Sequence, residues 1–176
     1  DCGAYDGDTL RLLLSRFSNL IHRYDAFEPD PVSLLRLRDA ARTLPPSWDG
    51  QLTIHGVALG ARRGTNRFRS VVGMGSTFDD TGEQEVEQET LDEVLAGRSP
   101  TFIKADVEGA ERDLLEGAIE LIRRCRPALA VCVYHRPDHY REIPLWLHSL
   151  GLGYRLYLRH HTHFFTSTVC YAVPDR

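Results

Sequence analysis

The chain opens with a glycine-rich turn whose polar residues could hold an adenosine-containing cofactor. The first nine residues read Asp-Cys-Gly-Ala-Tyr-Asp-Gly-Asp-Thr, with glycines at positions 3 and 7. Glycines in such a turn let the backbone approach a ligand closely, because side chains would obstruct it. Glu28 stands at the end of the next expected strand, where a carboxylate can accept both hydroxyls of an adenosyl ribose. The turn and the acid together indicate such a cofactor.

The acidity of this turn separates two classes of cofactor. A dinucleotide turn has the pattern Gly-x-Gly-x-x-Gly and offers a helix N-terminus to a pyrophosphate, whereas three residues separate Gly3 from Gly7. Asp1, Asp6 and Asp8 would repel a pyrophosphate, and they would attract the ammonium and sulfonium groups of S-adenosyl-L-methionine. The charges therefore favour the methyl donor over NAD. The alternative is that these Asp residues simply cap the following helix.

A second group of ionisable residues directly follows an apolar segment. Lys104, Asp106 and Glu108 come at the end of an expected buried strand, and charged groups in that position are costly unless they are used or paired. In α/β sheets the carboxyl ends of the strands form the edge where ligands bind. Gly109 permits a tight exit from the strand, and Glu111 is explained by the favourable field of a helix N-terminus.

A third motif, Tyr134-His135-Arg136-Pro137, follows the next expected strand. Parallel strands end at the same edge, so we expect His135 to lie beside Asp106. A histidine at a strand end is often structural. Its position beside an acid equally supports a role in proton transfer or in substrate binding.

Three histidines gather near the end of the chain, at positions 160, 161 and 163. Such a group suggests a metal, but ligands in a strand or turn usually need a carboxylate or Cys partner at a fixed spacing. We therefore expect His160 and His161 to contact a substrate or solvent and predict no metal site, with a metal at these histidines as the lesser alternative.

The segments that position these residues alternate between extended and helical patterns, which predicts an α/β fold with a mostly parallel sheet. Strands are expected over 24–28, 52–59, 101–106, 128–134, 154–159 and 166–173. Helices are expected over 10–17 behind an Asp8 or Thr9 cap, over 31–41 behind an Asp30 cap, and over 91–95, 110–124 and 140–150. The stretch 60–89, with short strands around Phe68 and Val86, is the least regular and is typical of a lid.

Composition fits one domain: 176 residues, 42% hydrophobic and 26% charged, with a formal net charge of −4. No basic block is present, which argues against a nucleic-acid partner, and no apolar run reaches the roughly 20 residues that span a bilayer. The chain begins inside a motif without Met, so we expect that part of its first strand has been removed. The absence of a Cys-x-x-Cys pair predicts reduced thiols in a cytoplasmic protein, without zinc or disulfides. The cysteines are Cys2, Cys125, Cys132 and Cys170.

Over nearly its whole length the chain resembles the FkbM family of methyltransferases. The matching segments are 1–9, 26–30, 90–92, 102–111 and 154–161, and the most specific of them is Ile-Lys-x-Asp-Val-Glu-Gly-Ala-Glu at 103–111. The resemblance implies a Rossmann-like class I methyltransferase fold. In that fold helices cover both faces of a mostly parallel seven-stranded sheet whose final strand is antiparallel, and one methyltransferase domain would occupy residues 1–176.

The resemblance also implies a cofactor and a class of acceptor. S-adenosyl-L-methionine would be held through its methionine part by Asp1, Gly3, Ala4, Tyr5 and Gly7, through its ribose by Glu28 with Pro29, and through its adenine by Gly56, Val57 and Ala58, with Asp106 also in contact. Family members mostly methylate hydroxyls of sugars, glycans and polyketide-like natural products. We therefore expect O-methylation of a small-molecule or glycan acceptor.

Methyl transfer to an alcohol needs a group that takes the hydroxyl proton. We expect His135 to be this base, because imidazole titrates near working pH, with Asp106 as the reserve candidate or as the group that orients the ring. Lys104 and Glu108 would hold the acceptor or the loop, and Tyr134, His160 and His161 would contact the substrate. The ring of Tyr5 or Tyr134 could lie against the methyl cation. An NAD-dependent oxidoreductase and a cofactor-binding module without activity remain the alternatives, and the oligomeric state is open.

Overall fold

Two units make up the part of the chain that the computed structural model describes, which is residues 1–176 except 49, 70–76, 79–83, 164–166 and 176. The first unit comprises residues 1–58 and 65–87, and the second comprises residues 59–64 and 88–176. The expectation of one methyltransferase domain over 1–176 stays a prediction. Among the described residues, the helices are all too short or too polar to cross a bilayer.

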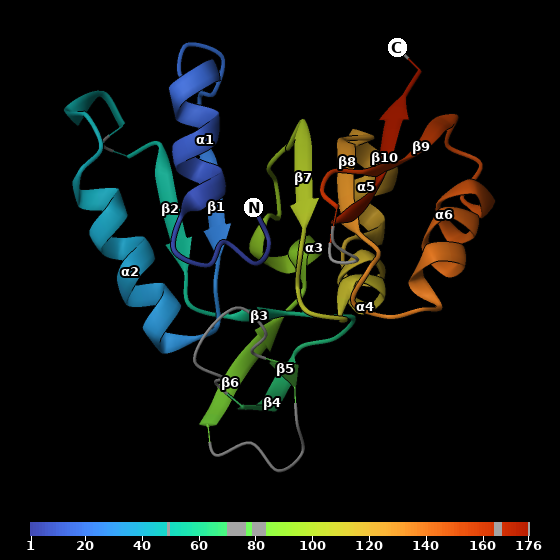
Figure 1. Ribbon diagram of the computed structural model, residues 1–176, viewed down its shortest axis with the longest axis horizontal. Helices are drawn as coiled ribbons and strands as arrows, with labels where there is room; N and C mark the ends of the chain where they lie inside the picture. Colours follow the sequence, from blue (N-terminus) through green and yellow to red (C-terminus); the bar gives the residue numbers. More distant parts are fainter. Residues whose placement is uncertain (49, 70–76, 79–83, 164–166, 176) are drawn as a thin grey trace. The chain divides into compact units, whose positions relative to one another are not determined.

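The first unit contains two parallel strands joined by a helix. Strand β1 (Tyr24–Phe27) pairs with β2 (Leu52–His55) in a register that sets Tyr24 against Leu52 and Phe27 against His55. Cys2 adds a parallel bridge to Phe27, so the polar turn follows directly from an extended segment. Helix α1 (Asp8–Phe17) precedes β1, and helix α2 (Pro31–Arg42) with the 3-10 helix η1 (Pro46–Trp48) connects β1 to β2 (Figure 1).

A separate small sheet accounts for much of the stretch expected to be irregular. Its strand order is β3-β6-β4-β5, with β4 antiparallel to β5. The predicted short strands around Phe68 and Val86 are confirmed as β4 and β6. The expected strand 52–59 is instead divided at Gly56, because the chain leaves β2 there and enters β3. The bounds are β3 (Ala58–Leu59), β4 (Gly64–Arg69), β5 (Thr77–Phe78) and β6 (Gln84–Glu89). Positions 70–76 and 79–83 of the expected lid lie outside the described residues.

Local signals explain how the helices of the first unit begin. The predicted Asp30 cap is confirmed: its side chain accepts a hydrogen bond from the Ser33 N–H at 2.8 Å, and Pro31 opens the helix. The expectation that Asp8 or Thr9 caps α1 is wrong, because Gly7 is the N-cap. Its φ of 86° is left-handed, and a Cβ there would lie 3.1 Å from Cδ1 of Leu37, so the position requires glycine.

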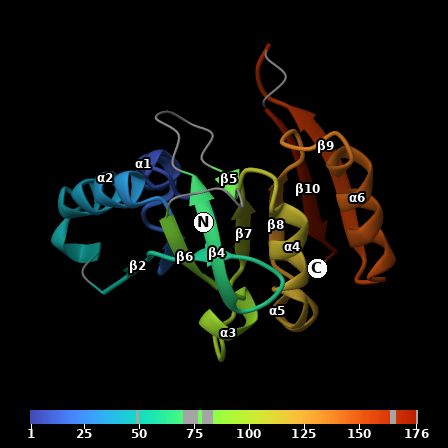
Figure 2. The ribbon, with the colours of Figure 1, turned by 90° about the horizontal axis from the view of Figure 1, so that it is seen from below.

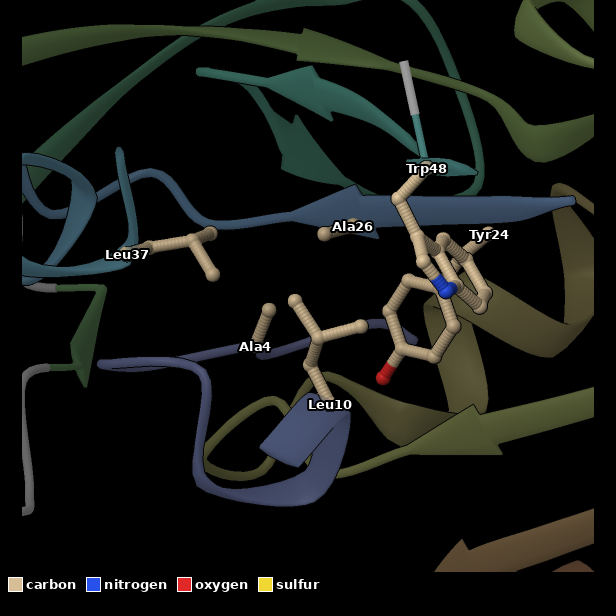
Figure 3. Close-up of a cluster of buried hydrophobic side chains, with 6 residues drawn as sticks. All are labelled: Ala4, Leu10, Tyr24, Ala26, Leu37 and Trp48. Carbon is tan, nitrogen blue, oxygen red and sulfur yellow. The ribbon is translucent and has the colours of Figure 1, made fainter. Parts of the chain in front are cut away.

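The core of the first unit fixes the polar turn. Tyr24 and Ala26 alternate along β1 and meet side chains from both helices and from η1 (Figure 3). The Tyr24 hydroxyl donates a hydrogen bond to Oδ2 of Asp1 at 2.6 Å. Tyr24 therefore packs in the core and also binds Asp1, the first acid of the turn. The cluster consists of Ala4, Leu10, Tyr24, Ala26, Leu37 and Trp48.

The second unit contains a four-stranded mixed sheet with the order β7-β8-β10-β9. Strand β7 (Phe102–Ala105) is parallel to β8 (Ala128–Cys132), and β10 (Thr168–Pro174) is antiparallel to both β8 and β9 (Tyr154–His160) (Figures 1 and 2). The mixed α/β class and the antiparallel final strand are confirmed. The described strands form sheets of two and four strands rather than one clear seven-stranded sheet, and the placement of helices on both faces stays a prediction.

The prediction of one helix over 110–124 is wrong in one respect: the segment forms two shorter helices, which are separated by a break around Gly117. The carbonyl of Gly117 accepts a hydrogen bond from the Asp92 N–H, and the Asp92 carboxylate accepts bonds from Glu120 and Leu121, at 3.1 and 2.7 Å. Asp92 therefore starts a new helix where the periodicity predicts continuation. The helices of this unit are α3 (Leu91–Val94), α4 (Glu111–Glu116), α5 (Ile119–Cys125) and α6 (His139–Ser149).

The apolar stripe predicted for this helical region is confirmed as core despite the break. Its members are Ala110, Leu114, Leu115, Ala118, Leu121 and Ile122, and all are buried. Strand β8 adds buried side chains from Leu129 to Cys132, which fits a central strand. Cys2, Cys132 and Cys170 are buried, and Cys125 is half-buried.

Candidate active site

The glycine turn of the first unit is fastened to the end of β1. The N–H groups of Gly3 and Ala4 both donate to the Phe27 carbonyl at 3.0 Å. Gly3 and Gly7 have φ values of 78° and 86°, which glycine adopts readily. Tyr5 also has a left-handed φ of 48°, a conformation that costs a residue with a side chain about 1–3 kcal/mol. The surrounding contacts therefore hold the turn in a shape that its sequence alone would not favour.

Glu28 lies directly against this turn and is only 7% exposed. Its Oε2 accepts a hydrogen bond from the Tyr5 N–H at 2.8 Å, and its Oε1 accepts one from the Asp30 N–H at 2.8 Å. Backbone donors thus orient both oxygens, and a carboxylate oriented in this way is an acceptor that suits hydroxyl groups. The left-handed conformation of Tyr5 directs its backbone N–H toward the Glu28 carboxylate.

The charges of the turn are more balanced than the sequence suggests. Arg11, on the first turns of α1, pairs with Asp6 at 2.9 Å, so one of the three expected negative charges has a cation beside it. Asp1 accepts the hydroxyl of Tyr24, and burial raises the pKa of that phenol, which keeps it a neutral donor. Asp8 is exposed. Arg11 stands five residues after Asp6 in the sequence, and the sequence analysis did not predict that the two would pair.

The residues expected near an adenine follow β2, the neighbour of β1. Gly56 is packed so closely that a Cβ would lie 2.9 Å from Cδ2 of Leu34. Val57 is half-buried, as is Pro29, and Ala58 is buried. Just before them, the His55 ring stacks on Phe27 with centroids 4.4 Å apart, and the His55 carbonyl accepts the Glu28 N–H at 3.0 Å.

In the second unit, the two polar motifs come together where β7 and β8 end. The Tyr134 hydroxyl donates to Oδ1 of Asp106 at 3.0 Å, and Nε2 of His135 lies 3.5 Å from the same oxygen. Lys104 places its Nζ 3.7 Å from Oδ2 of Asp106. The structure therefore brings Asp106 and His135 side by side because their strands are parallel neighbours.

Glu111 is the buried centre of this cluster. Its Oε1 accepts hydrogen bonds from the N–H groups of Val107 and Gly109 at 3.0 and 3.3 Å and lies 2.7 Å from Nδ1 of His135. Its Oε2 lies 3.1 Å from Nδ1 of His139. The sequence explained Glu111 by its helix N-terminus and passed over His139. The sequence did contain a sign of this contact, because His135, just before α6, and His139, its first residue, have the spacing His-x-x-x-His.

Glu108 brings a third carboxylate to the same imidazole. It has a left-handed φ of 54°, and Gly109 follows at 101°, so the chain turns sharply after β7. Oε2 of Glu108 lies 3.3 Å from Nε2 of His135. The ring therefore has Glu111 on its Nδ1 side, and Glu108 and Asp106 on its Nε2 side. The Tyr134 ring packs against it, with centroids 4.1 Å apart.

These neighbours shift the protonation of the cluster. Burial favours a neutral imidazole, but the hydrogen bond to Glu111 and the charges of Glu111, Glu108 and Asp106 raise the pKa of His135. Burial would likewise raise the pKa of Glu111, yet its bond and charge interaction with His135 lower it. Burial raises the pKa of Glu108 against the opposing charge of His135. Burial and the nearby Asp106 raise the pKa of Tyr134. The carboxylates thus favour a positive charge at the imidazole.

The terminal histidines make contacts within the β9–β10 hairpin. Nδ1 of His160 lies 2.8 Å from the Thr168 hydroxyl, and Nε2 of His161 lies 2.9 Å from the Tyr171 hydroxyl. Both histidines are exposed. In the part of the chain that the structure describes, the group with metal-like spacing is Asp106, Glu111 and His135 rather than these residues.

An acid directly after a parallel strand, here Glu28 after β1, and a glycine turn fastened beside it are typical of α/β proteins that bind adenosine-containing cofactors. The family model described as the methyltransferase FkbM domain matches residues 1–156. The chain belongs to the FkbM methyltransferase family.

Solved structures agree with this assignment. The methyltransferase FkbM from Methylobacillus flagellatus KT is 28% identical, with a TM-score of 0.83 over 98% of this chain. The chain spans 42% of the length of that protein. The methyltransferase domains of bacterial CtHen1-C and CtHen1-CN share the fold at 16% and 14% identity, with TM-scores of 0.55 and 0.53. Each match covers 99% of this chain and 88% of the other. The search of curated proteins gives no match.

Proposed function

We propose that this chain carries the S-adenosyl-L-methionine-dependent methyltransferase activity of an O-methyltransferase. The observation that carries the proposal is the buried Glu28 carboxylate, which backbone N–H groups of Tyr5 and Asp30 aim beside the glycine turn. The family match and the methyltransferase folds support it. A carboxylate held in this way suits the two hydroxyls of a ribose, and Asp1 suits an ammonium group.

The residues of the first unit fit the cofactor in shape as well as in charge. Gly3 leaves backbone accessible where a side chain would stand, Gly7 turns the chain into α1, and Ala4 and Tyr5 complete the turn around the methionine part. Glu28 with Pro29 would take the ribose. Gly56, Val57 and Ala58, which follow the strand β2 beside β1, would line the adenine. Each of these assignments is a proposal that a bound analogue can test.

When bound, S-adenosyl-L-methionine supplies a methyl group whose bond to sulfur breaks, leaving its electron pair on sulfur, as the bond to the acceptor oxygen forms. In-line alignment and exclusion of water supply much of the catalysis for such a displacement. The chain must also remove the hydroxyl proton. We assign this task to the cluster of the second unit, with His135 or Asp106 as the group that takes the proton and Asp106 as a further cofactor contact.

The acceptor is proposed to be a hydroxyl of a sugar, glycan or polyketide-like natural product. Lys104, Glu108 and Tyr134 surround Asp106 and His135 and would hold that hydroxyl. His160 and His161 are proposed as outer contacts, because they are exposed on the β9–β10 hairpin. A cytoplasmic location stays part of this proposal.

Two measurements test the function. Titration calorimetry with S-adenosyl-L-methionine, its demethylated product and NAD⁺ should show binding of the first two and none of NAD⁺. Transfer of a labelled methyl group to a panel of glycosides and polyketides should then identify the acceptor. Binding of NAD⁺ alone would indicate an oxidoreductase. Cofactor binding without transfer to any acceptor would indicate a module without activity.

A further inference from the structure

Imidazole and carboxylate groups converge in the second unit in an arrangement that suits a metal ion. Asp106, Glu111 and His135 each offer one ligand atom, and these atoms all lie within 4.8 Å of one another. Ligand atoms bound to one ion lie about 3–4 Å apart, since each is about 2.0–2.2 Å from the metal. The cluster is therefore only slightly wider than the ligand shell around one ion. Imidazole nitrogen and carboxylate oxygen are donors that divalent first-row metals accept.

The orientation of the His135 ring adds a second argument. Its Nδ1 lies 2.7 Å from Glu111, so the ring N–H is directed to that carboxylate. Nε2, the other ring nitrogen, faces Asp106 at 3.5 Å and Glu108 at 3.3 Å. Two carboxylates favour a positive charge at this nitrogen, which either a proton or a bound metal ion can supply. Metal-binding histidines are commonly oriented by a carboxylate on their other nitrogen in this way.

Two buried polar atoms lie on the Nδ1 side of the His135 ring, one from Glu111 and one from His139. Glu111 is fully buried and His139 is 2% exposed. Oε2 of Glu111 and Nδ1 of His139 lie 3.1 Å apart, yet neither has the alignment of a hydrogen bond with any described residue. A buried carboxylate is costly unless positive charge or donors offset it fully. Glu111 therefore places its negative charge between the rings of His135 and His139, on the Nδ1 side of His135.

We propose that Asp106 and Nε2 of His135 bind a divalent metal ion of the Mn²⁺ type, with Glu108 as a further oxygen donor and with Glu111 orienting the ring through Nδ1. Oxygen-rich donors with one imidazole suit this ion better than they suit thiolate-seeking metals. The side chains of Asp106 and Glu108 are 30% and 38% exposed, so solvent can reach the site. Its catalytic meaning rests on the proposed function: a bound cation would stabilise the acceptor oxygen as its proton leaves, and His135 would then act as a ligand rather than as a base.

The test is a titration of the chelator-treated full chain with Mn²⁺, followed by the EPR signal of the free ion. One Mn²⁺ should bind per chain. Asp106→Asn and His135→Ala should each weaken binding at least tenfold, whereas the control variants Asp113→Asn and His148→Ala, on exposed faces of α4 and α6, should bind as the unaltered chain does. Absence of binding up to millimolar Mn²⁺, or equal binding by the Asp106→Asn and His135→Ala chains, would overturn the proposal.

A measurement on the unaltered chain guards against variants that fail to fold. Mn²⁺ broadens NMR signals of nearby nuclei, so the ring signals of His135 should broaden at substoichiometric metal while those of His148 stay sharp. Equal broadening of both rings would contradict a site at His135. The outcomes also separate the two proposals. Mn²⁺ binding without methyl transfer would count against the function alone, and methyl transfer that survives chelation without any Mn²⁺ binding would count against the metal site alone.

Discussion

Gly117 lies directly against the backbone of Gly60, so closely that a Cβ at position 117 would overlap the carbonyl oxygen of Gly60. The same residue ends α4 and receives a hydrogen bond from Asp92. The break between α4 and α5 is therefore built around the missing side chain. A residue with a side chain could occupy this position only if the backbone of Gly60 moved.

Gly117→Ala should lower the free energy of unfolding by about 2 kcal/mol or more, because overpacking against backbone leaves no side chain free to give way. The matched control is Gly64→Ala, since a Cβ there meets nothing within 4 Å. Denaturant unfolding of both variants measures the difference. If Gly117→Ala unfolds at the same denaturant concentration as Gly64→Ala, close approach to Gly60 does not explain the break.

Asp92→Ala should destabilise the second unit by about 1 kcal/mol, because the N–H groups of Glu120 and Leu121 would lose the carboxylate that caps α5. Glu93→Ala is the control, since Glu93 is the exposed residue next to Asp92 in α3 and its side chain does not cap α5. Thermal unfolding of the two variants checks the prediction. A loss in Glu93→Ala as large as in Asp92→Ala would show that the cap has no special effect.

The contrast between Asp30 and Gly117 shows what the sequence could predict about the fold. Asp30 caps a helix through the Ser33 N–H three residues away, so the signal and its effect share one short segment. The break at Gly117 depends on Asp92 and Gly60, which lie far away in the chain. A periodic apolar stripe hides such a break, because all its members stay buried on both sides of it.

The same distinction applies to the candidate site. The sequence predicted that Asp106 and His135 meet, because both follow neighbouring parallel strands. It attributed Glu111 to a helix N-terminus, since nothing local revealed that the side chain is fully buried between His135 and His139. It also counted the charge of Asp6 without the pairing to Arg11. The residue types indicated which chemistry the site could perform, whereas the protonation of His135 and Glu111 depends on neighbours that only the structure reveals.

Glu28→Gln should weaken binding of S-adenosyl-L-methionine at least tenfold. The amide has one acceptor oxygen, so the Tyr5 or the Asp30 N–H would face an NH₂ group, and the buried mismatch should also lower stability by about 1–3 kcal/mol. Asp39→Asn, on the exposed face of α2, is the control and should change neither quantity. Titration calorimetry well below the unfolding temperature measures cofactor affinity on folded protein, so that it is separated from the loss of stability. Normal cofactor affinity in folded Glu28→Gln would remove Glu28 from the proposed ribose site.

Tyr134→Phe should slow methyl transfer about tenfold while leaving cofactor affinity unchanged. The substitution removes the hydroxyl that donates to Asp106 at 3.0 Å, and hydrogen bonds to charged groups contribute about 1.5–3 kcal/mol. Because the pKa of Tyr134 is raised, its hydroxyl stays protonated over the working pH range, so the variant should keep the shape of the pH–rate profile. Tyr157→Phe, on strand β9, is the control. A large rise in the dissociation constant of the cofactor in Tyr134→Phe would instead place this tyrosine at the cofactor.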